Sequence, residues 1–170
     1  MTRSEVQIPH RPPLCGVFLF SRLFFEEAQH LAQQATCTRA CCGSVIVAND
    51  GTIIGRGFNA PPNDDESQRK CDAKLDTSIK QNNDKTCCVH AEWNAILDAL
   101  KHHPLKVEGS TLYFMRVNSE GEFTEAGEPY CTVCSRLALQ SGIKTFGLWN
   151  GGPDMIATKI YNEKSYEYYH

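Results

Sequence analysis

Two short motifs constrain this chain more than any other feature: His90-Ala91-Glu92 and, further along, Cys131-Thr132-Val133-Cys134. Histidine and cysteine are the ligand types that zinc prefers, and a catalytic zinc takes three protein ligands together with a water molecule. His90, Cys131 and Cys134 supply such a set, and Glu92 adds a carboxylate that need not bind the metal. The two motifs therefore predict a zinc site with a base beside it.

Each motif begins a segment with helical spacing. Apolar residues recur at intervals of three and four after both motifs, until Gly142 ends the second run. In the first turn of a helix, side chains tilt toward the N-terminus, so His90 and Glu92 can converge although they are two residues apart. The helix dipole at that end also favours thiolates. We therefore expect two helix N-termini to face one metal ion.

The same residues also have a structural interpretation. A Cys-x-x-Cys pair by itself is compatible with a closed zinc site, or with buried thiols, in a binding module without activity. The additional His-x-Glu motif on a second predicted helix favours a catalytic site.

The wider sequence resembles the zinc-dependent cytidine/deoxycytidylate deaminase superfamily, whose members carry a His-x-Glu motif followed by Pro-Cys-x-x-Cys. The resemblance covers roughly residues 24 to 149 and is greatest to the deoxycytidylate branch. It extends to six further segments: Thr36-Cys37-Thr38-Arg39, Gly43-Ser44-Val45-Ile46-Val47, Gly57-Phe58-Asn59-Ala60-Pro61, Asn94-Ala95-Ile96, Gly109-Ser110-Thr111-Leu112-Tyr113 and Ser141-Gly142-Ile143.

The resemblance implies a three-layer α/β/α sandwich with a mixed sheet and hydrolytic deamination of deoxycytidine monophosphate, with Glu92 moving the protons. It also implies a homo-oligomer and regulation by a deoxynucleoside triphosphate. Two departures lie beside the expected pocket: Tyr130 stands between Pro129 and Cys131, and a hairpin-like segment spans 117–128. They leave open a free nucleoside, a modified cytosine or a purine base as substrate. A zinc-stabilised module that deaminates single-stranded nucleic acid is a separate alternative, which would need a basic groove.

Four residues are candidates for substrate contact. The resemblance makes Asn59 a ligand of the sugar or the pyrimidine edge, although an Asn after a strand is also an ordinary turn residue. Arg39 has a guanidinium fork suited to a phosphate, or to a surface ion pair. Ala91 and Tyr130 each adjoin a predicted metal ligand in the chain.

A second, structural zinc is a further hypothesis, with Cys37, Cys71 and one or both of Cys87 and Cys88 as its ligands. Some deoxycytidylate deaminases that the chain resembles carry such a zinc near three of these positions. A closed four-ligand site would tie the long polar loop 59–85 to its neighbours and contribute folding energy. The alternative is four buried thiols.

Composition bounds the remaining possibilities. With 170 residues, 41% of them hydrophobic, the chain can bury a sizeable core. We expect a tail over residues 1–20 and a single domain over 21–170. The net charge of −3 shows no electrostatic footprint for nucleic acid. The apolar run 17–25 is too short for a membrane span, and no signal peptide is recognisable, which favours the cytoplasm. The nine cysteines are then expected to be metal ligands and free thiols.

The order of the predicted elements indicates the fold. Ser21 can cap a helix from Arg22 to about Ala35, and Asn49-Asp50-Gly51 is a hairpin turn between strands over 43–48 and 52–58. Helices over 90–102 and 132–141 then alternate with strands over 111–117 and 145–149, before a Tyr-rich end over 150–170. A hairpin followed by alternating helices and strands predicts a mixed sheet with helices on both faces.

Overall fold

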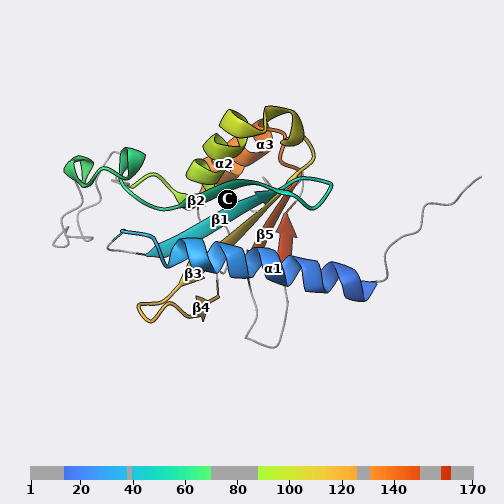
Figure 1. The fold of residues 1–170 in the computed structure, drawn as a ribbon, viewed down its shortest axis with the longest axis horizontal. Helices are drawn as coiled ribbons and strands as arrows, with labels where there is room; N and C mark the ends of the chain where they lie inside the picture. The colour runs from blue at the N-terminus through green and yellow to red at the C-terminus, as the bar shows by residue number, and fades with distance from the viewer. Residues whose placement is uncertain (1–13, 38–39, 70–87, 126–130, 150–157, 162–170) are drawn as a thin grey trace, which may run out of the picture.

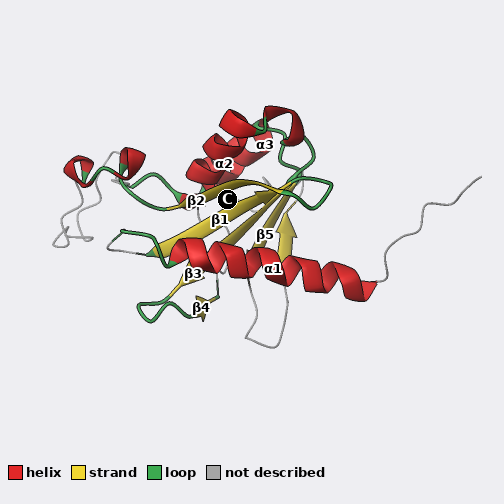
Figure 2. Cartoon of the chain, viewed as in Figure 1, coloured by secondary structure: helices red, strands yellow, loops and turns green. Residues whose placement is uncertain are grey.

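The computed structural model describes residues 14–37, 40–69, 88–125, 131–149 and 158–161, which form a sheet with helices on both faces (Figures 1 and 2). The six strands are β1 Cys41–Val47, β2 Ile53–Phe58, β3 Thr111–Val117, β4 Phe123–Thr124, β5 Thr145–Trp149 and β6 Thr158–Tyr161. The α-helices are α1 Leu14–Ala32, α2 Ala91–His102 and α3 Thr132–Gln140, and the short 3-10 helices are η1 Pro62–Asp64, η2 Glu66–Gln68 and η3 Pro104–Lys106.

The sheet is mixed, as predicted. Its strand order is β2-β1-β3-β5-β6, with β4 added beside β3. The β3–β5 pair is parallel, because α3 forms the crossover between these strands, whereas every other pair is antiparallel. The predicted three-layer α/β/α sandwich is confirmed.

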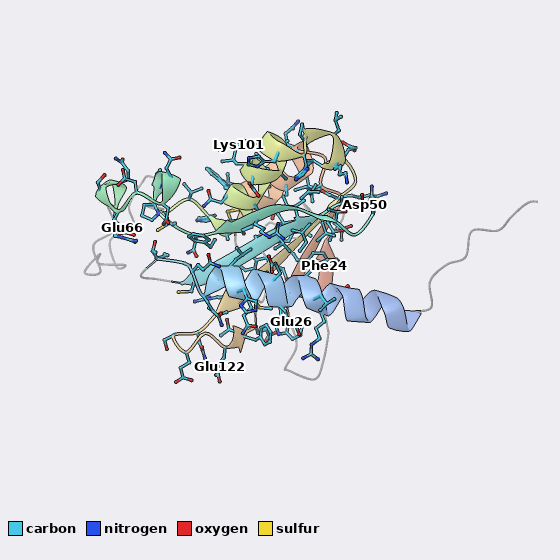
Figure 3. The ribbon with its side chains drawn as sticks, in the orientation of Figure 1. Phe24, Glu26, Asp50, Glu66, Lys101 and Glu122 are labelled. Atoms are coloured by element: carbon cyan, nitrogen blue, oxygen red, sulfur yellow. A yellow bond between two sulfur atoms is a disulfide. The ribbon has the colours of Figure 1, made fainter. Side chains whose placement is uncertain are left out.

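Two apolar cores lie on opposite faces of the sheet. α1 covers one face, while α2 and α3 lie together on the other (Figure 1). Because side chains alternate along a strand, β1 sends Val45 and Val47 toward α1 and Ile46 toward α2. Figure 3 shows Phe24 and Glu26 on α1, on the side of the sheet away from Lys101 on α2. The aromatic packing under α1 involves Phe24, Phe25, Tyr113, Phe123 and Trp149.

Two glycines in β2 allow α2 to approach the sheet closely. A Cβ atom on Gly57 would collide with the carbonyl oxygen of Ala91 and the backbone nitrogen of Ala95, and a Cβ on Gly55 would collide with the carbonyl oxygen of Ala95. Only glycine tolerates such a backbone approach without displacing the helix. The first turn of α2 is thereby held against the last residues of β2.

The predicted hairpin over 117–128 is confirmed as far as residue 125. Arg116 pairs with Thr124, and Val117 pairs with Phe123, after a turn that contains Gly121 at φ +80°. β1 occupies one edge of β3 along its whole length, so β4 lies on the other edge, beyond the point where β5 ends. This hairpin therefore extends the sheet at the end where β3 finishes.

The structure differs from the sequence analysis near both ends of the chain. The first helix begins at Leu14 rather than after Ser21, because the apolar residues before Ser21 continue the helical run and outweigh a capping signal. The strand β6 was not predicted; it pairs antiparallel with β5 inside the Tyr-rich end. No helix within the described residues is long and apolar enough to cross a membrane.

Candidate metal centre and active site

Three potential metal ligands meet at the N-terminal ends of α2 and α3. The Nδ1 atom of His90 lies 3.0 Å from the Sγ atom of Cys134. The ligand atoms of His90, Cys131 and Cys134 all lie within 4.8 Å of one another. Within the part of the chain that the structure describes, no other group of three His, Cys, Asp or Glu side chains is arranged to hold a metal ion. The predicted ligand set therefore comes together in space.

Both helices present these ligands at their caps. His90 is the N-cap of α2, in an extended backbone conformation. Cys131 is the N-cap of α3, and its Sγ atom accepts a hydrogen bond from the backbone N–H of Cys134 at 3.1 Å. This hydrogen bond and the positive end of the helix dipole both favour a thiolate. One imidazole and two sulfurs form a donor set found in catalytic zinc sites, so the residues fit zinc.

The two cysteines of this set are joined as a disulfide in the structure. This differs from the expectation that the cysteines are metal ligands and free thiols. The physical reason is that residues three apart on the first helical turn bring their sulfurs close enough either to bond or to chelate. Zinc binds the deprotonated thiols, so metal binding by this pair requires its reduced form.

Glu92 is a buried carboxylate two residues after the ligand His90 in the chain. It lies in the first turn of α2, and the residue is only 7% exposed. Burial raises the pKa of Glu92 to about 7, because the charged form loses its hydration, whereas a hydrogen bond from its own backbone N–H acts in the opposite direction. A group that titrates near neutral pH can both accept and donate a proton.

The side chain of Asn59 joins the end of β2 to the start of β1. Its Nδ2 atom donates to the carbonyl oxygen of Ala40 at 2.7 Å, and its Oδ1 atom accepts the backbone N–H of Cys42 at 2.8 Å. The backbone N–H of Asn59 also donates to the carbonyl oxygen of Cys42 at 3.2 Å. Asn59 thus holds the sheet together next to the α2 N-terminus, and its contact with substrate stays a prediction.

Two residues that the sequence analysis did not assign to the site lie at this end of the sheet. Cys42 on β1 pairs with Arg116 on β3. Burial and, next in size, the charge of Glu92 raise the pKa of Cys42 to about 12, while the positive charge of Arg116 acts in the opposite direction. In the sequence, Arg116 could have been noticed as the one charged residue in the strand over 111–117, near its end.

Of the other three predicted substrate residues, only Ala91 lies within the described structure. Ala91 is fully buried in the first turn of α2, against β2. Arg39 and Tyr130 lie outside the described residues, so their assigned contacts stay predictions.

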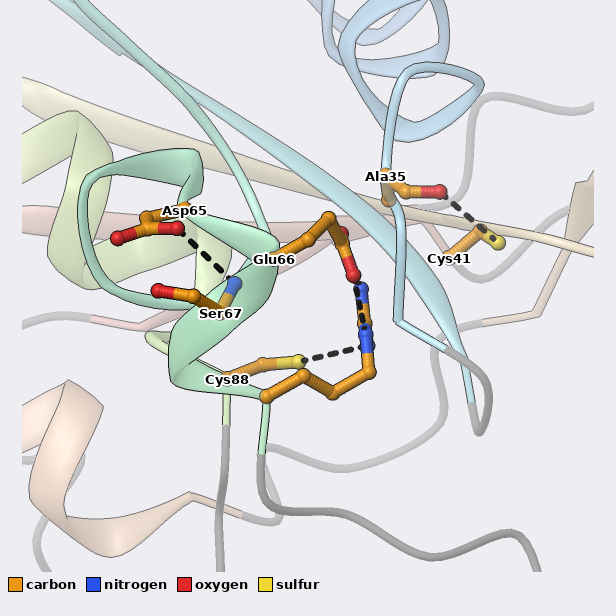
Figure 4. Close-up of polar contacts among 7 residues, drawn as sticks. Ala35, Cys41, Asp65, Glu66, Ser67 and Cys88 are labelled. Atoms are coloured by element: carbon orange, nitrogen blue, oxygen red, sulfur yellow. Dashed lines mark hydrogen bonds and ion pairs between the residues drawn. The ribbon is translucent and has the colours of Figure 1, made fainter.

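The cysteines of the hypothetical second zinc are described only in part. Cys88 is buried, and its Sγ atom lies 3.9 Å from Nη1 of Arg69, whose guanidinium is held by Glu66 at 2.6 Å (Figure 4). Cys37 is half-buried. Cys71 and Cys87 lie outside the described residues, so the second zinc also stays a prediction.

Comparisons with known proteins identify a family and similar folds. Residues 20–148 match the cytidine and deoxycytidylate deaminase zinc-binding region. The dCMP deaminase from the cyanophage S-TIM5 in apo form has a TM-score of 0.53 and 22% sequence identity, over 75% of this chain and 80% of its own. The cytidine deaminase from Burkholderia pseudomallei has a TM-score of 0.51 and 17% identity, over 83% and 91% of the two chains. No curated protein sequence matches the chain.

The His/Cys/Cys ligand set lies within the residues that match the zinc-binding deaminase region, so the protein is a zinc-dependent hydrolase. More specifically, the chain belongs to the cytidine and deoxycytidylate deaminase family, which makes it a hydrolytic deaminase of the cytidine or dCMP type.

Proposed function

We propose that this protein converts deoxycytidine monophosphate to deoxyuridine monophosphate and ammonia. The observation that carries the proposal is the convergence of His90, Cys131 and Cys134 beside the buried carboxylate of Glu92, in a chain of this family. Zinc bound by these three residues would supply Lewis-acid chemistry that lowers the pKa of water toward neutrality.

We assign the proton transfers to Glu92. Its carboxylate takes a proton from the attacking water and returns it to N3 of the cytosine ring as the oxygen adds to C4. A further proton leaves with the amino group, and ammonia is released. The raised pKa of Glu92 supports this assignment, because such a carboxyl changes protonation state with little driving force near pH 7.

The cytosine nucleotide is favoured by two motifs that the sequence shares with the deoxycytidylate branch. Asn94-Ala95-Ile96 follows the glutamate, and Gly57-Phe58-Asn59 ends β2. These motifs meet in the structure, because Nδ2 of Asn94 donates to the carbonyl oxygen of Phe58 at 2.8 Å. This hydrogen bond connects the helix that carries Glu92 with the strand that leads into Asn59.

Ammonia release by reduced, zinc-loaded protein tests the proposal. The panel comprises deoxycytidine monophosphate, cytidine monophosphate, deoxycytidine, cytosine, guanine and a cytosine-containing oligonucleotide, with each product identified. We expect turnover of deoxycytidine monophosphate to exceed that of every other compound. Turnover confined to unphosphorylated compounds would retain the deaminase and overturn the nucleotide.

The matched variant is Glu92→Gln, which keeps the shape of the side chain and removes the base. We expect it to retain zinc and to lose about 10²- to 10⁴-fold in kcat, the range that a positioned acid–base group supplies. Activity equal to wild type in a zinc-replete Glu92→Gln protein would remove Glu92 from the mechanism.

We also propose that the chain works in the cytoplasm as a homo-oligomer. Leu97 and Leu100 on α2 and Val133 on α3 support this assembly, because they leave large apolar side chains exposed on the two helices that carry the site. Light scattering coupled to size exclusion checks the assembly: a mass equal to the single chain's 19.0 kDa would contradict it.

A further inference from the structure

Arg116 lies on the sheet face that carries the candidate active site. Along β3, Leu112 and Phe114 face the core under α2 and α3, whereas Met115 and Val117 face the core under α1. Side chains alternate along a strand, so Arg116 shares the face of Leu112 and Phe114. It is the last residue of β3 on that face.

The neighbouring strands place Arg116 at the same end of the sheet as the site. Arg116 pairs with Cys42, and the backbone N–H of Cys42 donates a hydrogen bond to Oδ1 of Asn59, the residue directly after β2. The first turn of α2, which carries Glu92, packs on this end of β2. Both the Glu92 and the Arg116 charges act on the thiol of Cys42, in opposite directions. The guanidinium of Arg116 and the carboxylate of Glu92 are therefore both near Cys42 on β1.

The backbone of Arg116 is anchored, while its guanidinium has no assigned partner in the described structure. The Oγ1 atom of Thr124 donates to the carbonyl oxygen of Arg116 at 3.0 Å, and β4 pairs with it in register. Its side chain is exposed and makes no ion pair or hydrogen bond with any residue that the structure describes. By contrast, each of the arginines Arg22, Arg56 and Arg69 forms an ion pair with a glutamate.

We propose that Arg116 binds the phosphate group of the substrate and thereby makes the enzyme selective for a nucleoside monophosphate over a nucleoside. The proposal rests on the proposed deaminase function. A guanidinium presents several N–H donors in a planar fork that matches phosphate oxygens bidentately. It also offsets the negative charge that a phosphate brings near Glu92. The β3–β4 hairpin would serve to fix the position of this cation at the rim of the site.

Steady-state kinetics of Arg116→Gln, with deoxycytidine monophosphate and deoxycytidine as paired substrates, test this assignment. The protein is full-length, reduced and zinc-loaded. We expect kcat/KM for the monophosphate to fall about 10- to 100-fold, the usual worth of a charge-assisted hydrogen bond, mainly through KM. The kinetics of deoxycytidine should not change, because this substrate carries no phosphate.

Two further variants exclude general effects of the substitution. Arg116→Lys keeps the charge and loses the fork, so we expect it to recover part of the lost selectivity. Arg22→Gln removes an exposed arginine from α1 on the other face of the sheet and should leave both substrates unaffected. Circular dichroism confirms that each variant folds. An equal loss for both substrates, or an unchanged KM for the monophosphate in Arg116→Gln, would overturn the role of Arg116.

Failure of the proposed function would be visible in the wild-type protein alone. If wild type deaminates deoxycytidine and not the monophosphate, the nucleotide assignment and the role of Arg116 are both overturned. If wild type deaminates neither compound, calorimetric binding of the two compounds decides. Phosphate-dependent binding that Arg116→Gln abolishes would support the role of Arg116, whereas binding without preference for the phosphate would overturn it.

Discussion

At the scale of single residues, the site combines buried groups whose chemistry depends on their neighbours. Glu92 and Cys42 are both titratable groups whose pKa values are raised mainly by burial. Loss of hydration has different results for the two groups. It brings the pKa of Glu92 close to neutral pH, and it raises the pKa of Cys42 so far that the thiol stays protonated. Cys42 is therefore uncharged where a thiolate would repel Glu92.

We predict that Cys42 resists alkylation. With a pKa of about 12 instead of the ordinary 9.0, its thiolate is scarce between pH 7 and pH 10, and only the thiolate reacts. At pH 9 the folded protein should label at Cys42 at least about 100-fold more slowly than the urea-unfolded protein, and faster once Glu92 is changed to Gln. Mass spectrometry after iodoacetamide treatment measures both rates. Equal labelling of folded and unfolded protein would contradict the raised pKa.

We predict that Asn59→Ala destabilises the fold by about 1–3 kcal/mol, the cost of leaving buried polar groups without partners. The substitution removes the acceptor of the Cys42 N–H and the donor to the Ala40 carbonyl oxygen. Urea denaturation measures the change. The matched variant Asn59→Asp keeps the acceptor but places a carboxylate oxygen against the carbonyl oxygen of Ala40, so it should be destabilised as well. An unchanged midpoint in Asn59→Ala would exclude this structural role.

At the scale of elements, the site depends on how closely α2 approaches β2. Glycine at two alternate positions of β2 lets the helix backbone come within contact of the strand. The N-terminus of α2 then lies where β2 leads into Asn59, and α3 brings its own N-terminus beside it. The side chain of Asn94 fixes this arrangement, because its Nδ2 atom donates a hydrogen bond to the backbone carbonyl oxygen of Phe58.

Gly57→Ala should therefore impair both stability and catalysis. The added Cβ meets the backbone of α2, which cannot move aside as a flexible side chain can, so we expect a loss of about 1–3 kcal/mol and a displaced Glu92. Denaturant titration and kcat/KM measure the two effects. Gly147→Ala is the control, because its Cβ meets ring atoms of Tyr113, the nearest at 3.2 Å, and lies away from α2. A Gly57→Ala protein with wild-type stability and activity would refute the close approach.

At the scale of the whole molecule, the metal centre joins two helices that are distant in the chain. His90 and Cys134 are 44 residues apart, and the strand β3 and its hairpin lie between them. A metal bound by both helices thus links the two halves of the layer that covers one face of the sheet. Binding energy at such a site adds to folding energy.

We predict that a chelator lowers the melting temperature of the reduced protein. Zinc at a concentration of about 1,000 times its Kd stabilises the fold by about 4 kcal/mol. For a domain of this size, this corresponds to a rise of about 10 °C in the melting temperature. Differential scanning calorimetry with and without chelator measures the shift, and added zinc should reverse it. In Cys134→Ser, which lacks one ligand, the chelator should have a smaller effect. Identical shifts in the variant and the wild type would show that the metal is bound elsewhere.

The sequence by itself determined the parts of this protein that depend on local spacing. The His-x-Glu and Cys-x-x-Cys motifs, their places at helix N-termini and the strands over 111–117 and 145–149 all follow from patterns within a few residues. Local turn and capping chemistry is sufficient for such features. The start of α1 was missed because a serine that can cap a helix was outweighed by the apolar run before it.

Only the tertiary structure decided which distant residues become neighbours. Strand β6 needs the edge of β5 as its partner, and Asn59 reaches Ala40 because β2 pairs with β1. Arg116 lies at the same end of the sheet as Asn59 because β1 lies between β2 and β3, an order that no local pattern encodes. The ligands of the zinc site can thus be predicted from short sequence motifs. The residues that surround the site depend on strand pairing across the sheet, because that pairing joins segments far apart in the chain.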